Sequence, residues 1–182
     1  MQITEQQLLQ VIPKSASKVK IYVPVINKYA DAFGINTPMR MAHFLAQVLH
    51  ETAELVHVRE IGNENYCHKY EVGKLAKMLG NTQKGDGYKY KGRGLLQLTG
   101  RTNYQAYQNS KYCRGNIMDN PNLLEQPTGA VKSAMWYWQK HGLNRLADKD
   151  DFLGIRKVIN GGTNGLESCR RYLVKCKTAL GV

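Results

Sequence analysis

The sequence predicts a mainly α-helical protein with at most a small β element. Apolar residues recur at helical spacing over most of the chain. Capping residues, prolines and glycines stand at the ends of these apolar segments. Only the short segment 56–61 is rich in residues that favour strands. These three observations together exclude an all-β or an alternating α/β fold.

Length and composition favour a single folded domain. The chain has 182 residues, of which 42% are hydrophobic, and its 11 Tyr, 3 Phe and 2 Trp supply a core. We expect one domain over residues 1–182, in which helices of residues 1–36 pack on a core of residues 37–182. There is no internal repeat and no composition typical of a linker.

The N-terminal third contains three helix signals. Thr4 and Gln7 resemble a capping box, which begins a short helix ending at Val11. A second helix begins at Ser15 or Ser17 and ends at Gly34, and Pro24 predicts a kink or a late start. A third is expected from the Thr37-Pro38 pair to about His50. Its apolar face holds Met39, Ala42, Leu45, Ala46 and Leu49.

The rest of the chain alternates helices with glycine-rich loops. Helices are expected over residues 70–79, 102–112, 127–141, 148–159 and from about 166 to 180. Residues 83–94 form a Gly/Lys/Tyr-rich loop, and residues 160–165 require a tight turn that tolerates left-handed backbone.

The net charge of +12 favours polyanionic partners such as nucleic acid, anionic lipid or an acidic bacterial envelope. The first residues have no basic region followed by an apolar core, so they do not resemble a signal peptide. No apolar run approaches the roughly 18 residues of a membrane span. We therefore expect a chain made in the cytoplasm without stable membrane insertion.

The four cysteines, Cys67, Cys113, Cys169 and Cys176, are too few for a disulfide framework in a chain of this length. The absence of a CxxC motif disfavours a structural zinc knuckle. Whether Cys67 and Cys113 pair is left open.

The segment from His50 to Glu60 concentrates ionisable side chains, with three of the chain's 14 acidic residues. On one continuous helix, Glu51 and Glu60 would point in opposite directions, about 13.5 Å apart along the axis. The strand-like residues Val56 and Val58 indicate that the helix ends first. The two carboxylates can then act as an acid and a base about 6.5–9.5 Å apart, the arrangement of an inverting glycosidase. The alternative is that both are solvated surface residues.

The same segment allows a metal site. His50, Glu54 and His57 would share one face if the helix continued, and two His with one Glu can bind catalytic zinc. The metalloprotease motif HExxH is absent because position 54 is Glu. The strand-like residues at 56–58 also disfavour this metal-dependent alternative.

The loop from Tyr88 to Gly94 alternates aromatic residues with cations. This pattern is typical of nucleic-acid clefts and of sugar-binding clefts, and it also suits a flexible solvated loop. The P-loop pattern is absent.

Three blocks in this order resemble glycoside hydrolase family 19, the chitinase and endolysin family. They are Phe44 to Thr52, Tyr90 to Tyr104 and Val158 to Leu166. The resemblance extends over residues 40–175, and the second block is the most specific. It implies a two-lobed, lysozyme-like fold with a substrate groove, no cofactor and no metal.

The resemblance also implies residue roles. Glu51 matches the general acid, Glu60 the general base, and Thr99 the hydroxyl residue that helps to hold the attacking water. Gln97, Asn103 and Asn160 match substrate-binding positions, and Tyr90, Arg93 and Tyr104 are expected in or under the groove. One departure is Cys169, where many bacterial relatives carry an arginine. A supporting salt bridge is therefore expected to be missing or rerouted, and Arg170 and Arg171 are not assigned to catalysis.

The expected substrate is peptidoglycan, because the chain lacks a secretion signal and a chitin-binding module and its charge suits an anionic wall. We expect a monomeric endolysin that does not bind nucleic acid, is released by a separate holin and acts on the wall in the periplasm. A chitinase is the first alternative. A non-catalytic wall-binding module would leave the polar cluster of Gln97, Thr99 and Asn103 without a role.

Overall fold

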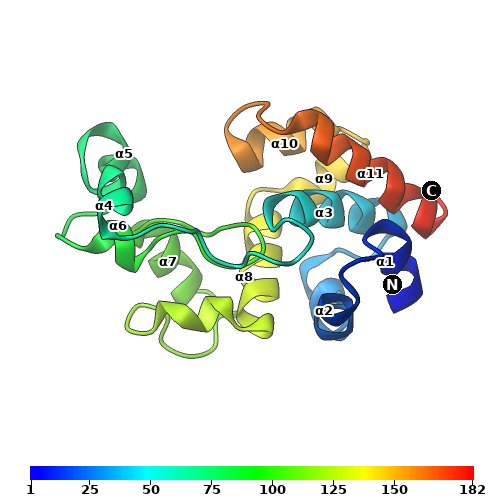
Figure 1. The fold of residues 1–182 in the computed structure, drawn as a ribbon, viewed down its shortest axis with the longest axis horizontal. Coiled ribbons are helices and arrows are strands. Elements are labelled where there is room, and N and C mark those ends of the chain that lie inside the picture. Colours follow the sequence, from blue (N-terminus) through cyan, green and yellow to red (C-terminus); the bar gives the residue numbers. More distant parts are fainter. The chain divides into compact units, whose positions relative to one another are not determined.

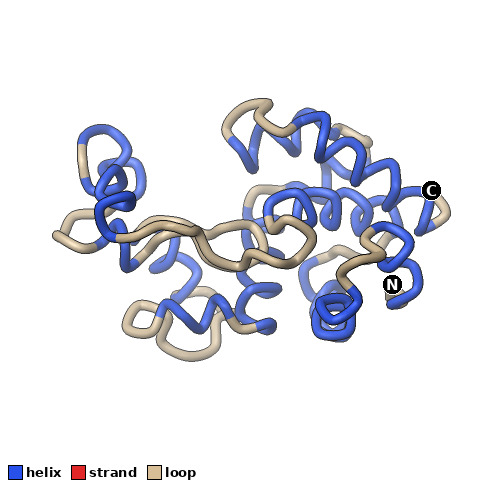
Figure 2. The backbone as a smooth tube through the Cα atoms, viewed as in Figure 1, coloured by secondary structure: helices blue, strands red, loops and turns tan.

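A computed structural model describes residues 1–182, and it is built from helices and loops (Figures 1 and 2). Its elements, in chain order, are α1 (Glu5–Val11), α2 (Ala16–Tyr29), η1 (Ala30–Phe33), α3 (Pro38–Glu51), α4 (Glu64–Cys67), η2 (His68–Glu71), α5 (Gly73–Leu79), α6 (Asp86–Lys89), α7 (Arg101–Gln108), η3 (Pro121–Glu125), α8 (Pro127–Lys140), α9 (Leu143–Asp148), α10 (Phe152–Asn160) and α11 (Leu166–Leu180), where η marks a 3-10 helix. The predicted mainly α-helical class is confirmed.

The chain divides into two compact units. Unit 1 comprises residues 1–57 and 135–182, and unit 2 comprises residues 58–134. Helix α8 continues from unit 2 into unit 1.

Helix α3 is the centre of unit 1. Thr37 accepts a hydrogen bond from the Arg40 amide, and Pro38 occupies the first turn, as the sequence predicts. Every residue from Met41 to Leu49 is buried, so the helix is covered on all sides instead of along one face. Helix α11 makes the most extensive packing against it (Figure 1).

The N-terminal helices follow their sequence signals closely. The Thr4–Gln7 capping box is present at the start of α1. Helix α2 begins at Ala16 and includes Pro24, so the expected alternative of a late start is wrong. Gly34 then ends η1 with a left-handed φ of 70°.

Trp138 anchors α8 in unit 1. Its ring is fully buried and meets Phe44 edge to face, with the ring centroids 5.5 Å apart. Its indole Nε1 donates to Asn144 Oδ1 at 2.8 Å, and Asn144 in turn donates to the Phe33 carbonyl. A buried aromatic of this size contributes about 3–5 kcal/mol to stability.

Unit 2 has less regular structure than the sequence predicts. The expected helix over 70–79 is replaced by η2 and the shorter α5. The extended backbone of Val72 separates the two, and Gly73 begins α5 with a left-handed φ of 62°. The expected loop over 83–94 contains α6, and α7 ends four residues before Tyr112. The small β element consists of two isolated bridges, which pair Arg93 with Arg59 and with Leu98.

Helix α9 was not predicted. Asp148 ends α9 instead of beginning the next helix, and Asp151 is the cap of α10, where it accepts from the Gly154 amide at 2.8 Å. All four cysteines are free, so Cys67 and Cys113 do not pair. None of the helices is long and apolar enough to cross a membrane.

Candidate active site

Glu51 is the last residue of α3, and Thr52 ends the helix. The buried Thr52 hydroxyl donates to the Val48 carbonyl at 2.7 Å and accepts from the Leu55 amide at 2.8 Å. Ala53, Glu54 and Leu55 then adopt left-handed φ values of 46°, 62° and 69°. The predicted end of the helix between Glu51 and Glu60 is therefore present, and it falls directly after Glu51.

The Glu51 carboxylate is held by Arg156 of α10. Arg156 Nη1 donates to Glu51 Oε1 at 2.5 Å, and the arginine side chain is 1% exposed while the glutamate is 22% exposed. The guanidinium also donates to Gln47 Oε1 at 3.1 Å and to the Asn164 carbonyl at 2.7 and 3.0 Å. This arrangement fixes the direction in which the carboxylate points.

Arg156 was not among the residues predicted from the sequence, where the resemblance placed the supporting arginine at the position of Cys169. The available signal was its position, because Phe152, Ile155, Arg156 and Ile159 share one helix face. A cation on an apolar face predicts a buried acidic partner. Cys169 is buried and donates from Sγ to the Ala46 carbonyl, and Arg170 stacks on Phe152, so neither contacts Glu51.

His50 and Glu54 support the same end of α3. His50 Nδ1 lies 3.2 Å from Ser168 Oγ, and burial, followed by the Arg156 charge, lowers the pKa of the imidazole. A Cβ at Gly165 would lie 2.3 Å from His50 Nε2, so only glycine fits there. Glu54 accepts from Tyr172 at 3.0 Å and from Ser15 at 3.4 Å.

The metal alternative loses its structural basis. It requires α3 to continue to His57, but the helix ends at Glu51 and reverses through left-handed residues. No group of three His, Cys, Asp or Glu side chains is placed to hold a metal ion.

A row of buried polar side chains extends back along α3 from Glu51. Gln47 and His43 precede it by four and eight residues, which places all three on one helix face. His43 Nε2 lies 2.7 Å from Asp150 Oδ1, while His43 Nδ1 and Gln47 Nε2 have no hydrogen-bond partner. Burial lowers the pKa of His43, against the opposing effect of Asp150.

Glu60 lies in unit 2 and is 17% exposed. Its amide donates to the Gly92 carbonyl at 2.8 Å, and its Oε2 accepts from the Gly92 amide at 3.3 Å. Its Oε1 accepts from the Tyr70 hydroxyl at 2.6 Å and lies 3.6 Å from Lys69 Nζ. Burial and the hydrogen bond to Glu60 raise the pKa of Tyr70 to about 12, so the hydroxyl remains a donor at neutral pH.

Gln97 and Thr99 approach the same glycine that binds Glu60. A Cβ on Gly92 would lie 2.8 Å from Gln97 Oε1 and 3.2 Å from Thr99 Oγ1. Gln97 has a left-handed φ of 52°, and its Nε2 donates to the Gly94 carbonyl at 2.9 Å. Thr99 donates to the Gln97 carbonyl at 2.8 Å. Unit 2 therefore gathers the half-buried side chains of Glu60, Gln97 and Thr99 around the buried backbone of Gly92.

The other predicted substrate-binding residues are placed differently. Asn103 donates from Nδ2 to the Thr99 carbonyl at 2.8 Å, which supports the turn. Asn160 is the exposed last residue of α10 in unit 1, and Gly161 continues it with a φ of 72°.

Tyr90, Arg93 and Tyr104 are all buried, so they support the loop from below and are not available as exposed sugar platforms. Arg93 donates to Glu125 Oε1 and to the Lys89 carbonyl, both at 2.8 Å, and to the Tyr104 hydroxyl at 3.1 Å. The tyrosine rings pack edge to face, with centroids 5.2 Å apart.

Comparison with known proteins identifies the class. The model of the glycoside hydrolase family 19, described as class I chitinase, matches residues 26–160. A glycosyl hydrolase family 19 domain-containing protein of Haemophilus influenzae is 30% identical over 200 residues, which cover 94% of each chain. Chitinase 8 of Oryza sativa subsp. japonica is 32% identical over 147 residues, covering 67% of this chain and 50% of that protein.

Among solved structures, chitinase C from Streptomyces griseus aligns with a TM-score of 0.74 over 99% of this chain and 77% of its own, at 24% identity, and shares the fold. The chain belongs to glycoside hydrolase family 19 and is a glycoside hydrolase. It spans nearly all of the Haemophilus protein and about half or less of the plant chitinases that it matches.

Proposed function

We propose that the protein is an endolysin-type hydrolase that cleaves β-1,4 glycosidic bonds of peptidoglycan by an inverting acid/base mechanism. Glu51 is the general acid that protonates the leaving oxygen, and Glu60 is the general base that activates water. The observation that carries this proposal is the gathering of Glu60, Gly92, Gln97 and Thr99. It combines a carboxylate with a hydroxyl and an amide oxygen, the groups needed to orient an attacking water.

Arg156 and Tyr70 orient the two carboxylates that carry out the proposed reaction. Arg156 holds the acid in one direction, and Tyr70 holds the base through a short hydrogen bond. Both contacts fix a reacting group before the substrate binds, which is how a site lowers the cost of reaching the transition state.

The net charge of +12 supports peptidoglycan as the substrate, since the wall is an anionic polymer. Chitin is the second candidate, because plant proteins named as an endochitinase and a chitinase match 78% and 67% of this chain. The proposal extends to a monomer that needs no cofactor, does not bind nucleic acid, and acts on the periplasmic wall after a separate holin opens the inner membrane.

One experiment tests the reaction and the substrate together. Purified peptidoglycan and chitin oligomers are digested in parallel, and the new reducing end and its anomer are identified by mass spectrometry and NMR. An α-anomer product from a β-linked glycan is expected, whereas a β-anomer would exclude inversion. Cleavage of chitin alone would replace the endolysin by a chitinase.

Variants at the two carboxylates test their roles. Glu51→Gln and Glu60→Gln are each expected to lower kcat by more than a hundredfold with unchanged folding. Glu54→Gln is the matched control, because it removes a neighbouring carboxylate that accepts bonds only from Tyr172 and Ser15. Full activity of Glu51→Gln would refute the mechanism. Loss of activity in EDTA would favour the metal alternative, and intact binding without hydrolysis would favour a non-catalytic module.

A further inference from the structure

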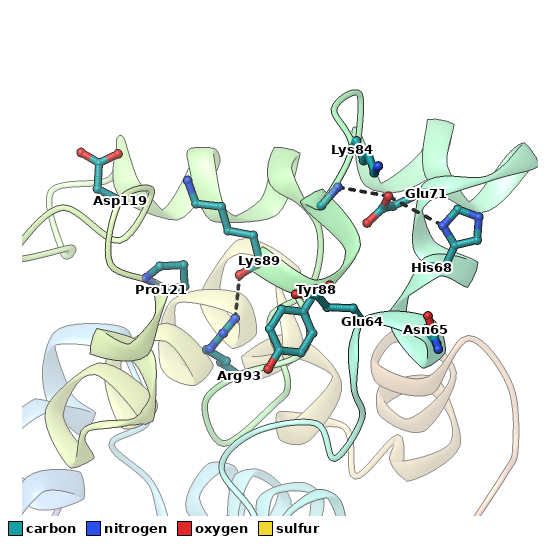
Figure 3. Close-up of a pocket in the computed structure, with 11 residues that line it drawn as sticks. Glu64, Asn65, His68, Glu71, Lys84, Tyr88, Lys89, Arg93, Asp119 and Pro121 are labelled. Carbon is teal, nitrogen blue, oxygen red and sulfur yellow. Dashed lines mark hydrogen bonds and ion pairs between the residues drawn. The ribbon is translucent and has the colours of Figure 1, made fainter.

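Unit 2 contains a cavity of about 470 Å³ that the proposed reaction does not use (Figure 3). One wall carries Glu64, His68 and Glu71 from α4 and η2, and the other carries Lys84 and Lys89 at α6 and the turn before it. Neither Glu60 nor Thr99 lines it. Its volume falls within the roughly 300–1,000 Å³ of small-ligand sites.

Two of the charged residues build the cavity walls. Glu71 accepts from the Gly85 amide at 3.1 Å and from the Gly87 amide at 3.0 Å, which ties the two walls together. A Cβ at Gly87 would lie 2.4 Å from the Cys67 carbonyl oxygen, so glycine permits this close approach. Arg93 donates hydrogen bonds to the Lys89 carbonyl, as Figure 3 shows, and also to Glu125 and to the Tyr104 hydroxyl, so its charge is already paired.

Four other charges remain available to a ligand. They belong to Lys84, Lys89, Glu64 and Asp119, which line the cavity, are exposed and form no ion pair within the protein. The half-exposed Tyr88 and the amide of Asn65 stand beside them. The lining of the cavity therefore offers two ammonium groups and two carboxylates, of which Glu64 stands on the wall formed by α4.

This charge pattern does not match an uncharged sugar chain, which is bound through aromatic faces and neutral polar groups. It matches a short zwitterionic peptide, whose carboxylates would pair with Lys84 and Lys89 and whose amine would pair with Glu64. The stem peptides of peptidoglycan have this composition, because they carry D-glutamate, a diamino acid and a terminal D-alanine. Chitin carries no peptide.

We propose that this cavity binds the stem peptide of peptidoglycan and so favours wall glycan over chitin. The inference rests on the proposed function, in which peptidoglycan is the substrate. Glu64, Lys84 and Lys89 are then specificity determinants that act on binding of the strand and not on the chemical step.

The first test compares three substrates. These are intact peptidoglycan, the same glycan stripped of its peptides by an amidase, and chitin hexamer. Lys84→Ala/Lys89→Ala is expected to lower kcat/KM at least tenfold on intact peptidoglycan and to leave the other two within twofold. The matched control is Lys74→Ala/Lys77→Ala, which removes the same charge from exposed positions outside the cavity. An equal loss on stripped glycan, or no loss on intact wall, would overturn the proposal.

The second test measures binding without hydrolysis. The free tetrapeptide L-Ala–D-Glu–diaminopimelate–D-Ala is titrated into the protein while the NMR signals of His68 and Tyr88 are followed. Saturable shifts that disappear in Lys84→Ala/Lys89→Ala are expected, and Glu64→Gln should weaken binding without abolishing it. Binding of the peptide by a protein that does not cut the wall would refute the proposed function alone. Wall cleavage without any peptide-induced shift would refute the cavity proposal alone.

Discussion

Arg156 Nη1 and Glu51 Oε1 lie 2.5 Å apart although 105 residues separate them in the chain. The arginine is almost fully buried, and the glutamate stands at the end of the most buried helix of the protein. A charge held this way serves both the folded state and the orientation of the carboxylate, so its removal should affect both.

Arg156→Ala is expected to lower the free energy of unfolding by about 3–5 kcal/mol, because it leaves Gln47, Glu51 and the Asn164 carbonyl without their donor. Arg156→Lys should have an unfolding free energy between those of the wild type and Arg156→Ala, since an ammonium group cannot make the several hydrogen bonds of the planar guanidinium. Urea unfolding measures both. Lys157→Ala, the exposed neighbour on α10, is the control and should change stability by less than about 0.5 kcal/mol. An equal loss of stability in Lys157→Ala would show that substitution anywhere on α10 destabilises the helix, and that the Arg156 contacts are not the cause.

Tyr70→Phe tests how Glu60 is held. The variant removes the 2.6 Å hydrogen bond to the carboxylate together with the interaction of the hydroxyl with Lys69, so we expect kcat to fall roughly tenfold with a small change in KM. Tyr66→Phe is matched, because this ring also lies under Lys69 but donates no bond to Glu60. Unchanged kcat in Tyr70→Phe would mean that the Gly92 amide alone positions the carboxylate.

Thr52→Val tests the hydroxyl of Thr52, because it removes this group and keeps the size and shape of the side chain. The valine cannot accept from Leu55 or donate to Val48, so the unfolding free energy should fall by about 1–3 kcal/mol. Thr52→Ser keeps both bonds and should recover most of the loss. Thermal unfolding of the three proteins at one pH gives the comparison, and equal stability of the Val and Ser variants would contradict it.

The buried histidines predict that stability falls on mild acidification. Burial lowers the folded-state pKa of His43 and His50 below the ordinary value of 6.5, so the unfolded chain binds more protons than the folded one as pH decreases through 6.5. Each histidine then destabilises the protein by at most about 1.4 kcal/mol per pH unit. The carboxyl groups of Asp86, Asp148 and Asp150 have lowered pKa values and affect stability in a more acidic range. The stability that they contribute is lost only below about pH 4.

Urea unfolding at pH 7, 6 and 5 measures this slope. His43→Gln should flatten this slope, because it removes the imidazole whose pKa burial lowers. A steeper slope in His43→Gln would reverse the assignment and show that Asp150 keeps the imidazole charged in the folded state.

The parts of the fold that the sequence predicts well are those with local causes. The Thr4–Gln7 box, the Thr37–Pro38 start of α3 and the Gly34 stop each lie within one helical turn of the feature they determine. Helix α9 was missed because Asp148 and Asp151 were both interpreted as a helix start, whereas Asp148 pairs with Arg40 at the end of α9. Long-range partners decide such cases.

The candidate site also combines features that the local sequence predicts with features that depend on long-range contacts. Helical geometry predicts that the helix ends between Glu51 and Glu60 if the two carboxylates share a site. The three left-handed residues that follow the helix are not glycines, so the sequence contains no signal for their conformation. The gathering of Thr99 and Gln97 near Glu60 depends on Gly92, whose lack of a side chain matters only once the loop is folded. Burial of Tyr90 and Tyr104 likewise depends on Arg93 and could not be seen from the alternating pattern.

The left-handed residues after Thr52 also bear on how this enzyme can be improved. Each non-glycine residue in that conformation costs about 1–2 kcal/mol, and Ala53 is exposed. Ala53→Gly would relieve this cost, so a screen for heat resistance should recover it. Such a gain would come from the second residue after Glu51, and thermostable variants should therefore be assayed for turnover before they are kept.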